Sequence, residues 1–182
     1  MPESSESLLG HLVALLFVSS QPLELATAAR VLRVSEREIE AFAARLAESP
    51  PPGLMLQRQG RALQLATAPA SAPYVRRLLG TPEVQRLSHP ALEVLAIVAY
   101  RQPVTRADVD GIRGVDSGRA LATLLARGLI EEVGRKETVG RPVLFGTSVG
   151  FLEYLGLRSL ADLPKVDGLG PGGNDSPARN DE

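Results

Sequence analysis

The stretch that decides the fold runs from His89 to Pro164 and reads HPALEVLAIVAYRQPVTRADVDGIRGVDSGRALATLLARGLIEEVGRKETVGRPVLFGTSVGFLEYLGLRSLADLP. Near its start, apolar residues recur at the spacing of one helix face and predict a first helix. The members of this stripe are Leu92, Leu95, Ala96 and Ala99. Proline lacks an amide hydrogen and favours an extended conformation in the residue before it, so Gln102-Pro103 ends the helix.

A second, shorter helix is predicted to begin at Thr105, because Asp108 follows it at the spacing of a capping box. Its inward-facing residues are Val109 and Ile112, and Gly114 ends it. These features predict two consecutive helices with a short break between them.

A third helix and a hairpin complete this half. Asp116 or Ser117 can accept the free amides at the start of the helix, and Gly128 is placed to end it. The apolar residues of this helix are Leu121, Leu124 and Leu125. Two β-prone segments, 129–133 and 142–147, flank a tip rich in glycine and charge. Three helices followed by such a wing predict a winged helix.

The first half of the chain repeats the same order of elements. An N-terminal helix is predicted from four leucines on one face, and Gln21-Pro22 ends it. Ser35 and Glu38 form a second capping box, at the start of the third helix. The predicted inward residues of the three helices are Leu8, Leu12, Leu15 and Leu16; Leu25, Ala28, Ala29 and Leu32; and Ile39, Phe42, Ala43 and Leu46.

A second wing follows these helices. Four leucines alternate with polar residues around the Gln59-Gly60 turn, as in a half-buried hairpin: Leu54, Leu56, Leu63 and Leu65. The spacing of the halves also agrees, because Pro103 follows Pro22 by 81 residues and Leu125 follows Leu46 by 79. We therefore predict a mainly α protein with small β-hairpins, arranged as tandem winged-helix domains.

The domain boundaries follow from composition. Residues 1–80 are predicted to form the N-terminal winged helix and residues 81–164 the C-terminal one, with a short helix around 74–79 and Gly80-Thr81-Pro82 as the join. Residues 165–182 contain too few apolar side chains to offset their ordering entropy, and this tail is expected to be disordered.

Composition excludes several classes of protein. The chain has 182 residues, no cysteine and a formal net charge of −1, so disulfides and thiolate metal sites are excluded and strong nonspecific attraction to nucleic acid is not expected. The apolar run 8–18 is too short to span a bilayer. We expect a cytoplasmic protein without a membrane anchor.

No enzymatic constellation is visible in the sequence. His11 lies on an apolar helix and His89 at a helix start, and neither has triad partners or a second metal ligand at a suitable spacing. The glycine-rich tail lacks the strand, helix and lysine of a phosphate-binding loop. No catalytic residue, cofactor or metal is predicted.

Two strings, RQPVTRADVDGIRGVDSGRALATLLARGLIEEVGRKETVGRPVLFGT and FLEYLGLRSLADLP, resemble segregation and condensation protein B, the bacterial subunit that joins a kleisin to a structural-maintenance-of-chromosomes (SMC) ATPase. The resemblance is dense over residues 88–164 and looser before them. Phe145 stands where the family usually has tyrosine, and Gly118-Arg119 also departs from its pattern. The resemblance implies a non-enzymatic accessory subunit that acts with the kleisin segregation and condensation protein A in chromosome condensation and segregation during cell division.

The resemblance also implies where partners bind. The family pairs through its N-terminal winged helices, and here Leu9, Val13 and Phe17 lie off the stripe of the first helix, so they are candidates for a homodimer interface. The C-terminal winged helix and nearby surfaces of the family grip the kleisin, and through it meet the ATPase. The apolar candidates for this contact are Phe151, Tyr154, Leu155 and Leu157.

The alternative function is a winged-helix transcription regulator or nucleoid protein. Against it, the third helix of the first half carries more carboxylates than cations, which would repel phosphates. The residues best suited to phosphate contact lie on the second wing: Arg135, Lys136 and Arg141. We expect DNA contact to be weak or confined to the assembled complex, so that the protein associates with the nucleoid through its partners.

Overall fold

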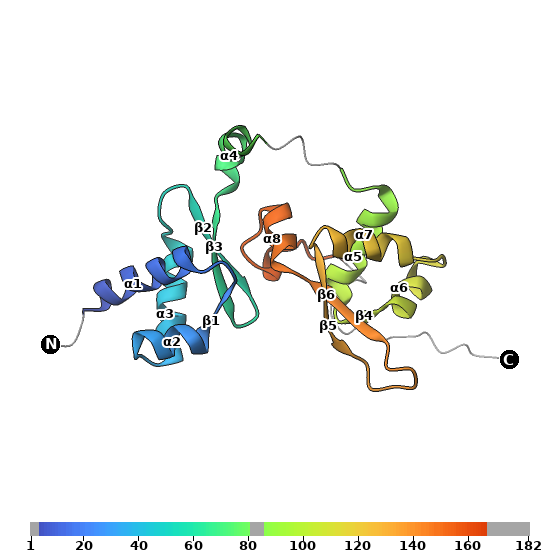
Figure 1. Ribbon diagram of the computed structural model, residues 1–182, viewed down its shortest axis with the longest axis horizontal. Helices are drawn as coiled ribbons and strands as arrows, with labels where there is room; N and C mark the ends of the chain where they lie inside the picture. The colour runs from blue at the N-terminus through green and yellow to red at the C-terminus, as the bar shows by residue number, and fades with distance from the viewer. Residues whose placement is uncertain (1–3, 81–85, 167–182) are drawn as a thin grey trace. The chain divides into compact units, whose positions relative to one another are not determined.

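The structure is a computed structural model that describes residues 4–80 and 86–166, and it divides into two compact units (Figure 1). Of the described residues, one unit comprises 4–80 with Leu152–Asp162, and the other comprises 86–151 with 163–166. The stretch Leu152–Asp162 therefore groups with the first unit, although it follows the second along the chain. Beyond Val166 the predicted disordered tail lies outside the described residues.

The two units share one order of elements, which confirms the tandem winged-helix fold. In the first unit this order is α1 (Ser5–Val18), β1 (Leu23–Glu24), α2 (Leu25–Leu32), α3 (Glu36–Glu48), β2 (Leu54–Gln59), β3 (Ala62–Thr67), the 3-10 helix η1 (Pro69–Ser71) and α4 (Ala72–Leu79). In the second it is α5 (His89–Arg101), β4 (Val104–Thr105), α6 (Arg106–Arg113), α7 (Gly118–Ala126), β5 (Ile130–Arg135) and β6 (Val143–Thr147). The helix α8 (Val149–Leu155) and the 3-10 helix η2 (Leu160–Asp162) follow.

Each wing gains a short third strand that the sequence did not predict. The sheets are antiparallel, with the orders β1-β3-β2 and β4-β6-β5. In the first sheet Leu23 pairs with Leu63, and in the second Val104 pairs with Phe145. Strands of two residues show no alternation in the sequence, so only pairing with a distant strand reveals them.

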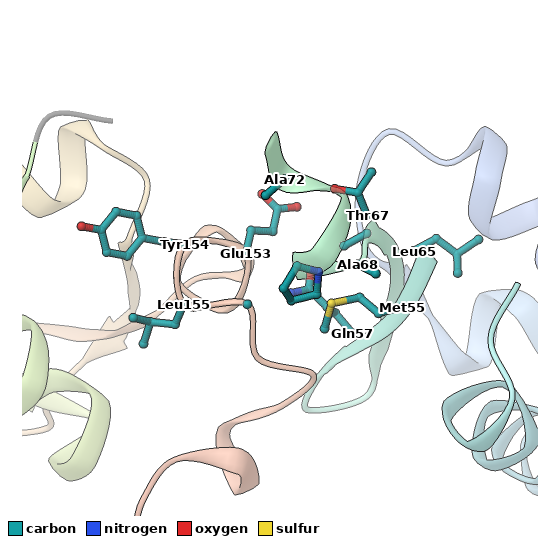
Figure 2. A pocket seen from close by; sticks show the side chains of 12 residues that line it. Met55, Gln57, Leu65, Thr67, Ala68, Ala72, Glu153, Tyr154 and Leu155 are labelled. Carbon is teal, nitrogen blue, oxygen red and sulfur yellow. The ribbon is translucent and has the colours of Figure 1, made fainter. Parts of the chain in front are cut away.

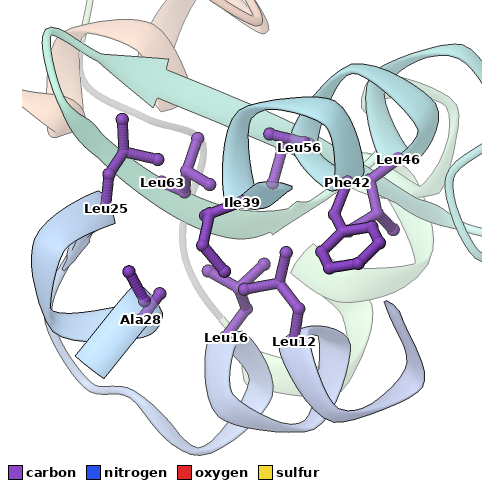
Figure 3. Packing of buried hydrophobic residues seen from close by; sticks show 11 residues of the cluster. Leu12, Leu16, Leu25, Ala28, Ile39, Phe42, Leu46, Leu56 and Leu63 are labelled. Atoms are coloured by element: carbon purple, nitrogen blue, oxygen red, sulfur yellow. The ribbon is translucent and has the colours of Figure 1, made fainter. Parts of the chain in front are cut away.

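The core of the first unit lies between its three helices and one face of its sheet (Figure 3). Its fully or nearly fully buried members include Leu12, Leu16, Leu25, Ala28, Ile39, Phe42, Ala43, Leu46, Leu56 and Leu63. The predicted inward face of α3 is confirmed in all four positions. Burial of these side chains supplies the main favourable free energy of this small unit.

Both predicted capping boxes are present. Ser35 Oγ accepts the amide of Glu38 at 3.3 Å, and the Glu38 carboxylate accepts the amide of Ser35 at 2.8 Å. Thr105 and Asp108 form the equivalent pair, at 3.2 and 2.9 Å. Each box satisfies amides that a helix start leaves without intrahelical partners, and so fixes where the helix begins.

The predicted inward faces of α5 and α6 were wrong in three positions. Leu92, Ala96 and Ile112 are exposed, with Leu92 at 46% and Ile112 at 52%. The face of α5 that packs inside instead contains Ala91, Val94, Leu95, Ile97, Val98 and Ala99. Because α5 is apolar on most of its circumference, helical spacing alone is compatible with several rotations of the helix about its axis. Packing against the rest of the unit selects one of them.

Candidate functional site

The predicted dimer residues on α1 lie in different environments. Leu9 and Val13 are half-buried and pack against the core of their own unit. Phe17 is 82% exposed, and the next residue, Val18, is 75% exposed. The end of α1 therefore presents apolar side chains to solvent, whereas Leu9 and Val13 offer only part of their surface to a partner.

A second exposed apolar face, which we did not predict, lies on α4. Tyr74, Leu78 and Leu79 are 69%, 86% and 65% exposed. The guanidinium of Arg77 lies 5.9 Å from the centre of the Tyr74 ring, within the range of a cation–π contact. The spacing of Tyr74 and Leu78 is visible in the sequence, but the sequence does not show that a short helix is left uncovered by its own unit.

The segment Leu152–Asp162 covers the face of the first sheet that points away from the helices. Leu56 and Leu65 are partners across β2 and β3 and face the helices, so the alternating residue Gln57 faces the opposite side. There the Gln57 Nε2 donates to the Leu157 carbonyl at 2.8 Å. At the free edge of β2, the Arg58 amide donates to the Arg158 carbonyl at 2.7 Å.

The predicted kleisin-contact residues are placed along this segment and just before it. Phe151 is 1% exposed and belongs to the interior of the second unit, so it is not available as a surface contact. Tyr154 and Leu155 are 37% and 46% exposed, and Leu157 is half-buried. We therefore retain Tyr154 and Leu155 as the accessible candidates, with Leu157 as a partly accessible neighbour.

A cavity of about 530 Å³ opens beside these residues within the first unit (Figure 2). Met55 and Gln57 on β2, the end of β3, and the start of α4 form its walls on one side. The residues Glu153–Gly156 form the other side. Its volume lies in the range that accommodates small molecules or single side chains of a partner.

The predicted phosphate contacts lie at the tip of the second wing, and internal interactions engage two of them. Lys136 Nζ lies 3.6 Å from Asp108 Oδ1. Arg135 Nη1 donates to the Arg141 carbonyl at 3.2 Å. Val139, which lies between Lys136 and Arg141 in the sequence, is fully exposed. The wing thus combines positive charge with an apolar tip.

Two carboxylates of α3, Glu36 and Glu40, are paired with arginines of the same unit. The Arg58 guanidinium contacts both oxygens of Glu40, at 2.6 and 2.7 Å, and this hydrogen bonding lowers the pKa of Glu40 against the opposing effect of burial. Arg45 binds Glu6 at 2.7 Å, and Arg61 binds Glu36. Arg58 and Arg61 are therefore engaged by carboxylates of the helix that would enter a DNA groove, and Arg45 on that helix is engaged by a carboxylate of α1.

The histidines have local partners. His11 Nε2 lies 3.2 Å from Ser7 Oγ on the same helix, and His89 Nε2 lies 3.1 Å from Glu93, which also binds Arg113. Within residues 4–80 and 86–166, no three histidine, aspartate or glutamate side chains gather in a way that could hold a metal ion. In this described part of the chain, no helix has both the length and the apolar character that crossing a bilayer requires.

The repeated order of three helices and a wing places the chain in the class of tandem winged-helix proteins. Its third helices are rich in carboxylates or weakly charged, and its outer helices leave apolar side chains exposed. A family model described as segregation and condensation complex subunit ScpB matches residues 10–166. The chain is a member of the segregation and condensation protein B family.

Two relatives of the same name agree with this assignment, and a solved structure was also matched. Segregation and condensation protein B of Symbiobacterium thermophilum is 48% identical over 159 residues, which cover 86% of this chain and 72% of that protein. The protein of the same name from Carboxydothermus hydrogenoformans is 44% identical over 161 residues, covering 87% and 86%. The crystal structure of ScpB from Mycobacterium tuberculosis is 37% identical, covers 86% of this chain and 99% of that one, and has a TM-score of 0.41.

Proposed function

We propose that this protein is a non-enzymatic adaptor in a chromosome segregation and condensation complex. It binds the kleisin segregation and condensation protein A and, through it, the SMC ATPase, in the cytoplasm and in association with the nucleoid. The observation that carries the proposal is membership of the segregation and condensation protein B family over residues 10–166. The ATP chemistry belongs to the partner.

The surface chemistry supports a polypeptide partner. Large apolar side chains are exposed on several elements, among them α1, α4 and α8, and each of these three has charged or polar residues beside it. Exposed apolar groups of this kind gain free energy when a partner covers them. The third helices offer few unengaged cations to a phosphate backbone, so affinity for DNA would lack its principal source.

Homodimerisation is part of the proposal and is assigned to α1. Phe17 is its principal contact, with Leu9 and Val13 contributing the parts of their surfaces that the core leaves open. A dimer would present two copies of each kleisin-binding surface, which raises the effective concentration of the second site once the first is occupied.

Two measurements test these statements together. Light scattering of the purified chain at micromolar concentration should give the mass of a dimer, and Phe17→Asp should shift it toward the monomer, whereas the equally exposed control Leu78→Asp should not. Titration with purified kleisin should give saturable binding. A monomeric wild-type protein that does not bind kleisin would contradict the proposal.

The second candidate is direct DNA binding through the wing, and the clustered cations at its tip favour it. If Arg135, Lys136 and Arg141 neutralise phosphates, replacing all three by glutamine should reduce both the affinity for duplex DNA and the dependence of that affinity on salt concentration. Fluorescence polarisation at several salt concentrations measures both quantities. If neither the affinity nor its salt dependence changes, the wing does not bind DNA, and the adaptor is the one candidate function that remains.

A further inference from the structure

Three exposed arginines at the turn between α2 and α3 have no side-chain partner within residues 4–80 and 86–166. These turn arginines are Arg30, Arg33 and Arg37. The other arginines of the first unit are engaged: Arg45, Arg58 and Arg61 bind carboxylates, Arg76 donates to a carbonyl, Arg77 lies over the Tyr74 ring and Arg158 pairs with Asp162. The unengaged arginines in the described part of this unit therefore gather within eight consecutive positions.

Two of the turn arginines occupy positions that local structure disfavours. Arg33 is the C-cap of α2 with φ of +55°, in the left-handed region where glycine is the usual residue. The C-cap of α6, the counterpart of α2 in the second unit, is Gly114 with φ of +71°. Arg37 lies in the first turn of α3, where the helix dipole favours anions over cations. Departures of this kind from local preference are typical of functional positions.

Neighbouring carboxylates leave the charge of the turn arginines uncompensated. On the first half of α3, Glu36 and Glu40 are bound by arginines of the hairpin, and Glu38 closes the capping box. Within the described residues, the carboxylates of this helix pair that lack a partner are Glu24 and Glu48. Both lie at the helix ends remote from the turn. The turn therefore has a local excess of positive charge, which attracts an anionic partner.

The surroundings of the turn favour a peptide over nucleic acid. Val31, which follows Arg30, is 49% exposed, and an apolar side chain of a peptide can cover it, whereas a phosphate group cannot. A DNA duplex that reached the turn would also place its groove against α3 and its phosphates beside the carboxylates of that helix. A short acidic segment of a polypeptide contacts the turn without approaching the rest of α3.

We propose that the turn arginines bind a short acidic segment of a partner polypeptide, and that an apolar side chain of this segment packs on Val31. The inference rests on the proposed function in naming that polypeptide as the kleisin. Guanidinium groups suit the role, because each presents donors to a carboxylate in a planar fork. The site uses no residue of the interface proposed on α1, so each protomer of a dimer would carry its own copy.

Substitutions in the full chain test the site against kleisin. Arg37→Gln should weaken kleisin binding about threefold, as for one exposed ion pair. Replacement of all three turn arginines by glutamine should weaken it roughly thirtyfold, if the three losses add. The matched control Arg119→Gln changes the exposed second residue of α7, the third helix of the other unit, and should leave binding unchanged. Equal affinity of the triple variant and the control would overturn the site and leave the proposed function intact.

Arg33→Gly separates a role in binding from a role in folding. Glycine adopts the left-handed conformation without a steric cost, so this variant should need at least as much urea to unfold as the wild type does. It should nevertheless bind kleisin about threefold more weakly, because one cation is lost. Weaker binding accompanied by lower stability would mean that Arg33 serves the fold, and would contradict its place in the site.

A synthetic peptide tests the turn without kleisin. An acetylated pentapeptide amide with four glutamates around one leucine should shift the backbone NMR signals of Val31, Arg33 and Arg37, and the same peptide with glutamines should not. A short DNA duplex is the competing ligand. If the duplex shifts these signals and the acidic peptide does not, the turn is a phosphate site and the proposal is wrong. If the wild-type chain does not bind kleisin, the proposed function fails, and the two peptides then decide the turn alone.

Discussion

Asp108 connects two elements of the second unit through one carboxylate. Its Oδ2 accepts the amide and the hydroxyl of Thr105, at 2.9 and 2.7 Å, and its Oδ1 lies 3.6 Å from Lys136 at the wing. Partial burial raises the pKa of Asp108, but the hydrogen bonds from Thr105 and the charge of Lys136 outweigh it, so the pKa lies below the usual range of an aspartate. Such local pairs could be predicted from the sequence because capping depends on residues three positions apart.

Replacing this carboxylate should give a pH-dependent loss of stability. A group whose pKa is lower in the folded than in the unfolded state stabilises the fold above its unfolded pKa, about 3.9 for aspartate, and ceases to do so as the pH falls through the folded value. We expect Asp108→Asn to reduce the free energy of unfolding by roughly 1 kcal/mol at pH 7, as for a weakened helix cap. The difference from the wild type should narrow below about pH 4. Urea unfolding at pH 7 and pH 3 measures it, and a difference that is independent of pH would contradict the assignment.

Gly156 marks a close approach that the sequence alone does not reveal. Its φ is +67°, and a Cβ at this position would lie 3.0 Å from Pro69 Cγ. We expect Gly156→Ala to destabilise the first unit by about 2 kcal/mol, since an L-residue in the left-handed region costs roughly 1–2 kcal/mol before any contact is counted. The matched control Gly60→Ala, with φ of +56° and nothing within 4 Å, should show only the backbone cost. Equal losses in urea unfolding would mean that Pro69 moves aside freely.

At the scale of elements, α5 shows which features of a helix the sequence pattern predicts and which it does not. The helix itself, its start at His89 and its end before Gln102 follow from local signals, and all are observed. Its rotation does not follow from them, because apolar residues occupy most of its circumference. Arg113, whose side chain is only 10% exposed, binds Glu93 at 2.9 Å, and the neighbouring Leu92 stays at the surface.

The rotation of α5 can be tested with a pair of matched substitutions. Leu95 is 4% exposed and Leu92 is 46% exposed, although the sequence placed both on the inner face. We expect Leu95→Ala to cost roughly 2–5 kcal/mol, as for truncation of a buried leucine. Leu92→Ala should change stability by less than about 0.5 kcal/mol, as for a surface position. If chemical unfolding gave similar losses of stability for both variants, Leu92 would be as buried as Leu95, and the inner face of α5 predicted from the sequence would be correct.

At the scale of the whole molecule, the repeated order of elements was predictable and the grouping of the last described segment was not. The two winged helices follow from helix periodicity, prolines and turns that recur about 80 residues apart. The return of Leu152–Asp162 to the first sheet depends on contacts between positions about 100 residues apart, such as Gln57 with Leu157. The exposed residues Tyr154 and Leu155 were identified as candidates from their apolar character, but the cavity beside them requires that return and could not be foreseen.

This grouping predicts how truncation affects the first unit. In a chain that ends at Leu155, the Arg58 amide at the edge of β2 has lost the Arg158 carbonyl, and Gln57 has lost that of Leu157. Hydrogen exchange of the Arg58 amide should become about fivefold faster, the factor that corresponds to roughly 1 kcal/mol for one hydrogen bond. A control chain that ends at Val166 retains both carbonyls and should exchange like the full-length protein. An edge strand without a neighbour exposes unpaired amides. Slow exchange of the Arg58 amide in the shorter chain would therefore mean that another segment covers this edge. The assignment of Leu152–Asp162 to the first unit would then be wrong.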